Sequence, residues 1–69
     1  MEALRQEQFT QLPLLRVRLK QLGASYKPKS STESMHVYWS QRTRQWLGVT
    51  VNPRGGYMLG YYAGCPCQS

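Results

Sequence analysis

Few side chains in this 69-residue sequence have the chemistry of a catalytic or metal site. The candidate zinc ligands are His36, Cys65 and Cys67, which is fewer than the roughly four that a tetrahedral zinc site uses. A zinc ion shared between two chains is one reading, and free thiols near the C-terminus are the reading that we favour. A pair of carboxylates, a plausible Ser-His-Asp set and a phosphate-binding glycine loop followed by a helix are all missing from the sequence. We therefore expect a protein that is not an enzyme and that needs no metal or cofactor.

Positive charge is the chemistry that the sequence offers most clearly. Nine Lys and Arg residues stand against three Glu residues and no Asp, so the formal net charge is +6. An excess of this kind favours a polyanionic partner, most often a nucleic acid, although charge also serves solubility. Six of the nine are Arg, which binds phosphate in a fork and stacks on flat rings. The partner that we expect first is nucleic acid, DNA rather than RNA.

Basic and aromatic side chains from residue 27 onward are the candidate contacts to that partner. The basic candidates, which would hold phosphates from predicted turns and from one loop, are Arg42, Arg44, Arg54, Lys27 and Lys29. The aromatic candidates, which would lie against sugars or bases, are Tyr38, Trp46 and Tyr62.

The same composition fits a second class of function. Interfaces between proteins are enriched in Arg and aromatic residues and poor in acidic ones. A small inhibitor or assembly factor with an acidic protein partner is therefore the alternative. A homodimer would form through Leu14 and Val17, which fall opposite the main apolar stripe of a predicted helix, or through an exposed edge strand at 57–64.

The elements that position these residues divide into a helical front and a stranded back. Residues 1–23 contain good helix formers, and a stripe of leucines at spacings of three and four runs through positions 12–22. Pro13 predicts a break or a first turn there, with Thr10 as a possible cap, and Gly23 suits the position just past the helix. Residues 24–34 read as a mobile basic loop.

From Met35 onward the apolar period changes to two, which predicts a three-stranded antiparallel meander over residues 35–63, followed by a tail at 64–69. The sequence NPRGG makes the second turn clear, because Pro53 fits its first central position and the two glycines permit positive φ. That turn places Val49 opposite Leu59 on the core face and Gly48 opposite Gly60 on the far face. The two glycines leave either an open trough or a gap that an aromatic ring fills. For the first strand we expect Val37 and Trp39 on the core face. The predicted fold is a single α+β domain over 1–69, with an N-terminal helix packed on this meander.

The segment VYWSQRTRQWLGVTVNPRGGYMLGYY, residues 37–62, resembles the three-stranded sheet of ethylene-response-factor type DNA-binding domains and of the arm-binding domains of phage integrases. Arg42, Arg44, Trp46 and the Leu59-Gly60-Tyr61 ending stand where those sheets carry corresponding residues. The resemblance implies that the sheet enters the DNA major groove, with Arg and Trp side chains on bases and phosphates.

The sequence also bears on location. No stretch approaches the roughly 18 to 20 apolar residues of a membrane span, and the N-terminus lacks the apolar core of a signal peptide. We expect a cytoplasmic protein, or a nuclear one in a eukaryote, with no membrane partner.

Overall fold

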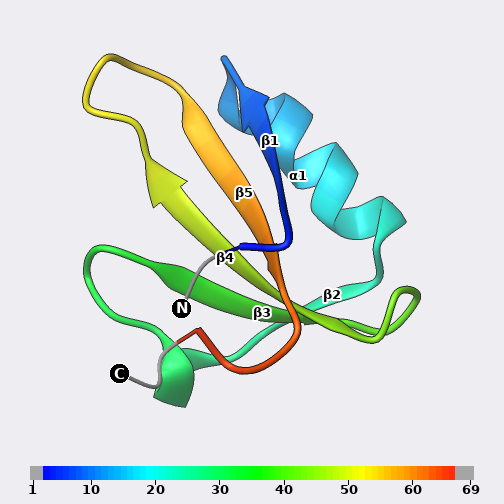
Figure 1. Ribbon diagram of the computed structural model, residues 1–69. Coiled ribbons are helices and arrows are strands. Elements are labelled where there is room, and N and C mark those ends of the chain that lie inside the picture. The colour runs from blue at the N-terminus through cyan, green and yellow to red at the C-terminus, as the bar shows by residue number, and fades with distance from the viewer. Residues whose placement is uncertain (1–2, 67–69) are drawn as a thin grey trace.

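The computed structural model describes residues 3–66, which form one α-helix and a single antiparallel sheet (Figure 1). In chain order the elements are β1 (Arg5–Phe9), α1 (Leu12–Gln21), β2 (Ala24–Tyr26), the 3₁₀ turn η1 (Pro28–Ser30), β3 (His36–Ser40), β4 (Gln45–Val51) and β5 (Tyr57–Tyr62). The sheet order is β1-β5-β4-β3-β2. The α+β class is confirmed, but the described residues make a five-stranded sheet in place of the expected three-stranded meander. No helix within residues 3–66 is long and apolar enough to cross a membrane.

The first correction concerns residues 5–9, which form strand β1 and not the start of a helix. β1 pairs along its whole length with β5, with Glu7 opposite Leu59. Helix propensities of Arg, Gln and Glu amount to a few tenths of a kcal/mol per residue, so pairing with a buried strand outweighs them. The helix begins only at Leu12, after Gln11 as N-cap, and Pro13 lies in its first turn, where no backbone donor is lost.

Pairing with β1 also changes the edges of the sheet. β5 lies between β1 and β4, so the segment that starts at Tyr57 is not the exposed edge that the sequence suggested. The outer strands are β1 and the three-residue β2. A second copy pairing edge to edge would therefore meet β1 or β2.

Residues 24–34 are more ordered than a mobile loop. Ala24–Tyr26 pairs with β3, and the segment stays attached beyond it because the Lys27 amide donates to the Val37 carbonyl oxygen at 2.8 Å. Ser31 Oγ adds a bridge, since it accepts the Val37 amide proton at 2.8 Å and donates to the Lys27 carbonyl oxygen at 2.8 Å. The basic segment is thus held along the outer side of β3.

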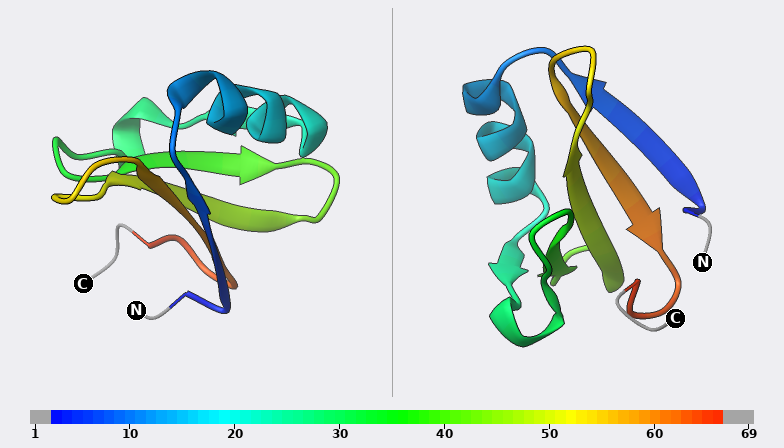
Figure 2. Two further views of the ribbon diagram at one scale, coloured as in Figure 1. Left: turned by 90° about the horizontal axis from the view of Figure 1, so that it is seen from above. Right: turned by 90° about the vertical axis from the view of Figure 1, so that its left-hand side faces the viewer.

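α1 covers one face of the sheet, and the C-terminal segment lies toward the other face (Figure 2). The core between helix and sheet consists of Leu15, Leu22, Leu47, Val49, Leu59 and Tyr61. The predicted pairs of β4 and β5 are confirmed, with Val49 opposite Leu59 and Gly48 opposite Gly60. Leu14 and Val17 point out of this core, with 52% and 56% of their surface exposed. The apolar stripe of the helix therefore packs on the sheet as its spacing predicted.

The expected register of β3 is wrong by one residue. Val37 pairs with Gly48 and Trp39 with Trp46, so Val37 and Trp39 lie on the face away from the helix, and Tyr38 lies on the helix side. The cause is the turn length, because four residues separate the pair Ser40–Gln45 and a one-residue slip exchanges the two faces of a strand. Val37 is nonetheless only 1% exposed. Met35 and Pro66 line a small cavity with it, so the far face carries a second, minor apolar cluster.

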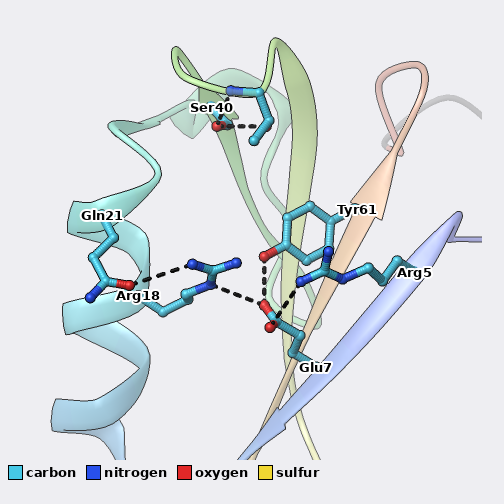
Figure 3. Close-up of polar contacts among 7 residues, drawn as sticks. Arg5, Glu7, Arg18, Gln21, Ser40 and Tyr61 are labelled. Carbon is cyan, nitrogen blue, oxygen red and sulfur yellow. Dashed lines mark hydrogen bonds and ion pairs between the residues drawn. The ribbon is translucent and has the colours of Figure 1, made fainter.

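A partly exposed ion cluster ties the helix to the first and last strands (Figure 3). Glu7 Oε1 accepts hydrogen bonds from the Tyr61 hydroxyl at 2.5 Å and from Arg18 Nε at 3.2 Å, and Glu7 Oε2 pairs with Arg5 at 3.1 Å. The Arg5 guanidinium also lies 4.8 Å from the centre of the Tyr61 ring. Partial burial raises the pKa of Glu7, but the hydrogen bonds from Tyr61, Arg18 and Arg5 outweigh it and the net pKa is lowered. Glu7 is therefore a structural carboxylate.

Candidate nucleic-acid interface

The turn between β3 and β4 is fixed to the end of the helix by a buried hydroxyl. Ser40 has no exposed surface, and its Oγ donates to the Leu22 carbonyl oxygen at 2.8 Å. The same oxygen accepts from the amide of Thr43 at 3.2 Å and from the Thr43 hydroxyl at 2.8 Å. The Arg42 amide donates to the Leu22 carbonyl oxygen as well, at 3.3 Å. These bonds hold the turn rigidly against the helix.

Arg44 occupies the last position of this turn in a left-handed conformation. Its φ is +54°, and it is the one non-glycine residue with positive φ among residues 3–66. Gly and Asn adopt this conformation most readily, while other side chains pay a steric cost. The Arg44 side chain is exposed and makes no hydrogen bond or ion pair with any described residue. Arg42 is also exposed, and its Cγ lies close to Gly23.

Two tryptophans lie beside this basic turn, on the face of the sheet away from the helix. Trp39 and Trp46 are directly opposite each other on β3 and β4, with ring centres 5.3 Å apart and planes inclined at 68°. Both are partly exposed. We call the group of Trp39, Arg42, Arg44 and Trp46 the hairpin-end surface. These residues share one end of the β3–β4 hairpin: the rings lie on the far face of the sheet, and the turn beside them carries the two guanidinium groups. Rings and guanidinium groups are the chemistry that suits nucleic-acid bases, sugars and phosphates.

Negative charge is kept away from the hairpin-end surface. Among residues 3–66 the acidic side chains are Glu7, which is bound by two arginines on β1 and α1, and Glu33, which lies in the segment before β3. Neither is at the turn between β3 and β4. No acidic side chain on this turn therefore offsets the charges of Arg42 and Arg44.

The glycine trough expected on the far face is filled. A Cβ added to Gly60 would lie 2.9 Å from Tyr62 Cε1, and one added to Gly48 would lie 2.9 Å from Met35 Sδ and 3.0 Å from Tyr62 Cε1. The Tyr62 ring thus crosses both glycines, and Tyr62 is only 7% exposed. Of the two alternatives for the space at Gly48 and Gly60, the structure shows the one in which an aromatic ring fills it.

The remaining predicted contacts are not gathered at the hairpin-end surface. Tyr38 lies on the helix side of the sheet, against Tyr26 at 5.4 Å between ring centres. Lys27 precedes η1 and Lys29 lies within it, beside the first residues of β3 and at the opposite end of that strand from Arg42. Arg54 lies in the turn between β4 and β5, at that other end of the sheet as well. The structure therefore places Arg42, Arg44 and Trp46 at one end of the β3–β4 hairpin and Tyr38, Lys27, Lys29 and Arg54 elsewhere. Tyr62 pairs with Trp46, but its ring is buried over the two glycines.

Trp39 is a member of the surface that sequence reasoning missed. It was assigned to the core because the segment QRTR did not reveal the length of its turn. A four-residue turn with Arg44 in a left-handed conformation places Trp39 on the same face as Trp46. No signal short of the turn geometry distinguishes the two registers.

The cysteine and metal predictions have separate outcomes. Cys65 is disulfide-bonded, so the expectation of a free thiol is wrong for this residue, and Cys67 lies outside the described residues. Within residues 3–66 there is no group of three or more His, Cys, Asp or Glu side chains placed to hold a metal ion.

Comparisons of the chain with protein-family models, with curated proteins and with solved structures found no match. The resemblance of residues 37–62 to ethylene-response-factor type sheets stays a prediction.

Proposed function

We propose that this protein binds nucleic acid, DNA in preference to RNA, through the hairpin-end surface. The observation that carries the proposal is the conformation of Arg44. A residue held in a sparsely populated backbone region costs on the order of 1 kcal/mol or more, and such residues cluster at functional sites. Glycine would relieve that cost at Arg44, yet the chain places there a long cation whose side chain makes no hydrogen bond or ion pair with any described residue.

The neighbouring residues supply the other contacts that a nucleic acid needs. Arg42 and Arg44 present guanidinium groups, which bind phosphate oxygens in a fork. Trp39 and Trp46 offer partly exposed rings on which a base or sugar can lie, with stacking worth about 1–3 kcal/mol per base. The net charge of +6 adds long-range attraction to the polyanion.

The test is a titration of a short DNA duplex and a matched single strand at two salt concentrations, run beside a thermal melt. Arg44→Gly should raise the melting temperature slightly, because it removes the positive-φ cost, and should weaken binding. It should also reduce the slope of log affinity against log salt by about one. Trp46→Ala should weaken binding with little change in stability, since a partly exposed ring contributes modestly to folding.

The matched control is Arg54→Gln, which removes one positive charge at the opposite end of the sheet, compared with Arg44→Gln. Equal losses from the two changes would mean that binding reflects net charge and not the hairpin-end surface. Absence of salt-dependent binding to either form of DNA would overturn the proposal.

The alternative is a protein partner, either an acidic protein or a second copy of the chain, and one observation favours a protein contact. Leu14 and Val17 are each more than half exposed on neighbouring turns of α1, where solvent-facing positions are usually polar. Sedimentation of the purified chain over a range of concentrations tests whether a second copy covers this face.

A further inference from the structure

A groove of about 410 Å³ opens between α1 and the sheet, on the helix side of the sheet and away from the hairpin-end tryptophans. Its size falls within the range of small-molecule sites in proteins, about 300–1,000 Å³. One wall is the helix, the floor is formed by β3, β4 and β5, and the other wall is the segment that leads into β3. The helix thus leaves part of the core face of the sheet uncovered.

The floor and the helical wall of the groove are apolar. Val49, Val51 and Tyr57 form the floor, and three of the helical leucines line the wall. Val51 is 70% exposed, although it belongs to the face of β4 that carries the core residues Leu47 and Val49. An apolar body in the groove would remove this surface from water, and each Å² so covered contributes about 25 cal/mol.

Hydrogen-bond donors lie beside this apolar floor. Arg16 lines the groove from the helix and makes no ion pair or hydrogen bond with any residue in 3–66. Tyr38 lines it from β3, and its hydroxyl likewise has no hydrogen bond within the described part of the chain. Burial raises the pKa of Tyr38, as does Tyr26 to a lesser degree, while the charge of Arg16 lowers it, so the guanidinium acts on the Tyr38 hydroxyl.

Two other titratable groups line the groove from the opposite wall. His36 stacks on Tyr26 with ring centres 5.9 Å apart, and Glu33 lies in the segment just before it. A ligand with a negative headgroup is therefore attracted by Arg16 and repelled by Glu33. Because Arg16 attracts an anion and Glu33 repels it, changing either residue should change the affinity for an anionic ligand in opposite directions.

We propose that the groove binds a small organic acid, with its apolar body on Val49, Val51 and Tyr57 and its carboxylate on the Arg16 guanidinium and the Tyr38 hydroxyl. The site is independent of nucleic-acid binding, because it uses the helix side of the sheet and none of the residues of the hairpin-end surface. Failure of either proposal therefore leaves the other standing.

Decanoate, kept below its micellar concentration, is the probe, and amide chemical shifts of the labelled protein are the readout. We expect saturable binding to one site, with shifts at the groove residues and none at Trp39 or Arg44. Decyltrimethylammonium, which has the same chain and the opposite charge, should bind at least about tenfold more weakly.

Charge variants test the assigned headgroup. Arg16→Gln should weaken decanoate binding about tenfold, as expected for one charge-assisted hydrogen bond. Lys20→Gln, which removes one positive charge one turn further along the same helix and outside the groove, should leave the affinity unchanged. Glu33→Gln should strengthen decanoate binding, because it removes the repulsion.

Any one of several outcomes would overturn the proposal. They are equal binding of the two probes, equal effects of Arg16→Gln and Lys20→Gln, the absence of saturable shifts, and groove shifts that depend on protein concentration without probe. The last would show that a second copy of the chain is the occupant. Preferential binding of an acidic amphipathic peptide over decanoate would likewise identify the groove as a protein-docking site.

Discussion

The Tyr62 ring lies directly on the backbone of Gly60. A Cβ added to Gly60 would be 2.9 Å from Tyr62 Cε1, 3.0 Å from the Tyr62 hydroxyl oxygen and 3.2 Å from Tyr62 Cζ. Gly60 pairs with Gly48, so two side chains are absent side by side and one ring takes their place. The paired glycines thus leave the space in which the Tyr62 ring packs on the far face of the sheet.

This contact predicts that Gly60→Ala is destabilising by about 1–3 kcal/mol, because the added methyl overpacks against a rigid, buried ring. Gly48→Ala should cost less. Its added Cβ would lie 2.9 Å from Met35 Sδ, at the flexible end of a side chain that can shift. It would approach the Tyr62 ring at one atom, Cε1 at 3.0 Å, whereas a Cβ at Gly60 approaches three Tyr62 atoms. Urea unfolding of both variants measures the difference, and the ordering would be contradicted if Gly48→Ala were the more damaging change.

Ser40→Ala should lower the free energy of unfolding by about 1–3 kcal/mol. The substitution removes all three hydrogen bonds of the buried Ser40 hydroxyl. The Thr43 amide loses this acceptor, and the Leu22 carbonyl oxygen keeps only the longer bond from the Arg42 amide. Ser25→Ala, on the exposed side of the short strand β2, is the control and should change stability by less than about 0.5 kcal/mol. Similar effects from the two changes would show that the buried hydroxyl does not anchor the turn.

Leu15 and Leu14 are neighbours in sequence with opposite surroundings, 2% and 52% exposed. Leu15→Ala should cost about 2–5 kcal/mol through lost burial and a residual cavity, which is a large share of the stability of so small a domain. Leu14→Ala should be close to neutral in the monomer. Thermal melts at low protein concentration compare them. A large loss for Leu14→Ala at that concentration would mean that the outer face of α1 is covered.

The lowered pKa of Glu7 makes stability dependent on pH. Since the folded-state pKa lies below the ordinary glutamate value of 4.5, the ionised form is favoured by folding, and its contribution is present above that value. The contribution should be lost as the pH falls through the folded-state pKa. Between about pH 6 and pH 2 the free energy of unfolding should fall as the pH is lowered. This fall should be smaller in Glu7→Gln and unchanged in Glu33→Gln. If the pH dependence of stability were the same in Glu7→Gln as in the original chain, Glu7 would not be its cause.

Local sequence patterns predicted much of this fold. The leucine spacing predicted the buried side of α1. The sequence NPRGG predicted the turn between β4 and β5, and the position of this turn predicted the pairing of Val49 with Leu59. Gly23 was predicted just past the helix, and its φ of +64° confirms it. In each of these cases the deciding interaction lies within one helix or one hairpin, so the period of apolar residues and the turn chemistry are sufficient.

Tertiary structure decided the rest, because the deciding partner is distant in sequence or depends on a single residue of register. Residues 5–9 carry helix-forming side chains, yet they form β1, since the open edge of β5 more than 45 residues away pairs with them. The turn length after Ser40 set which of Trp39 and Tyr38 faces the helix, and thereby assembled the hairpin-end surface and gave the groove its hydroxyl. The composition alone indicated a basic domain rich in aromatic residues. An apolar period of two, however, does not show which face of a strand points to the core, because that depends on the length of the adjoining turn.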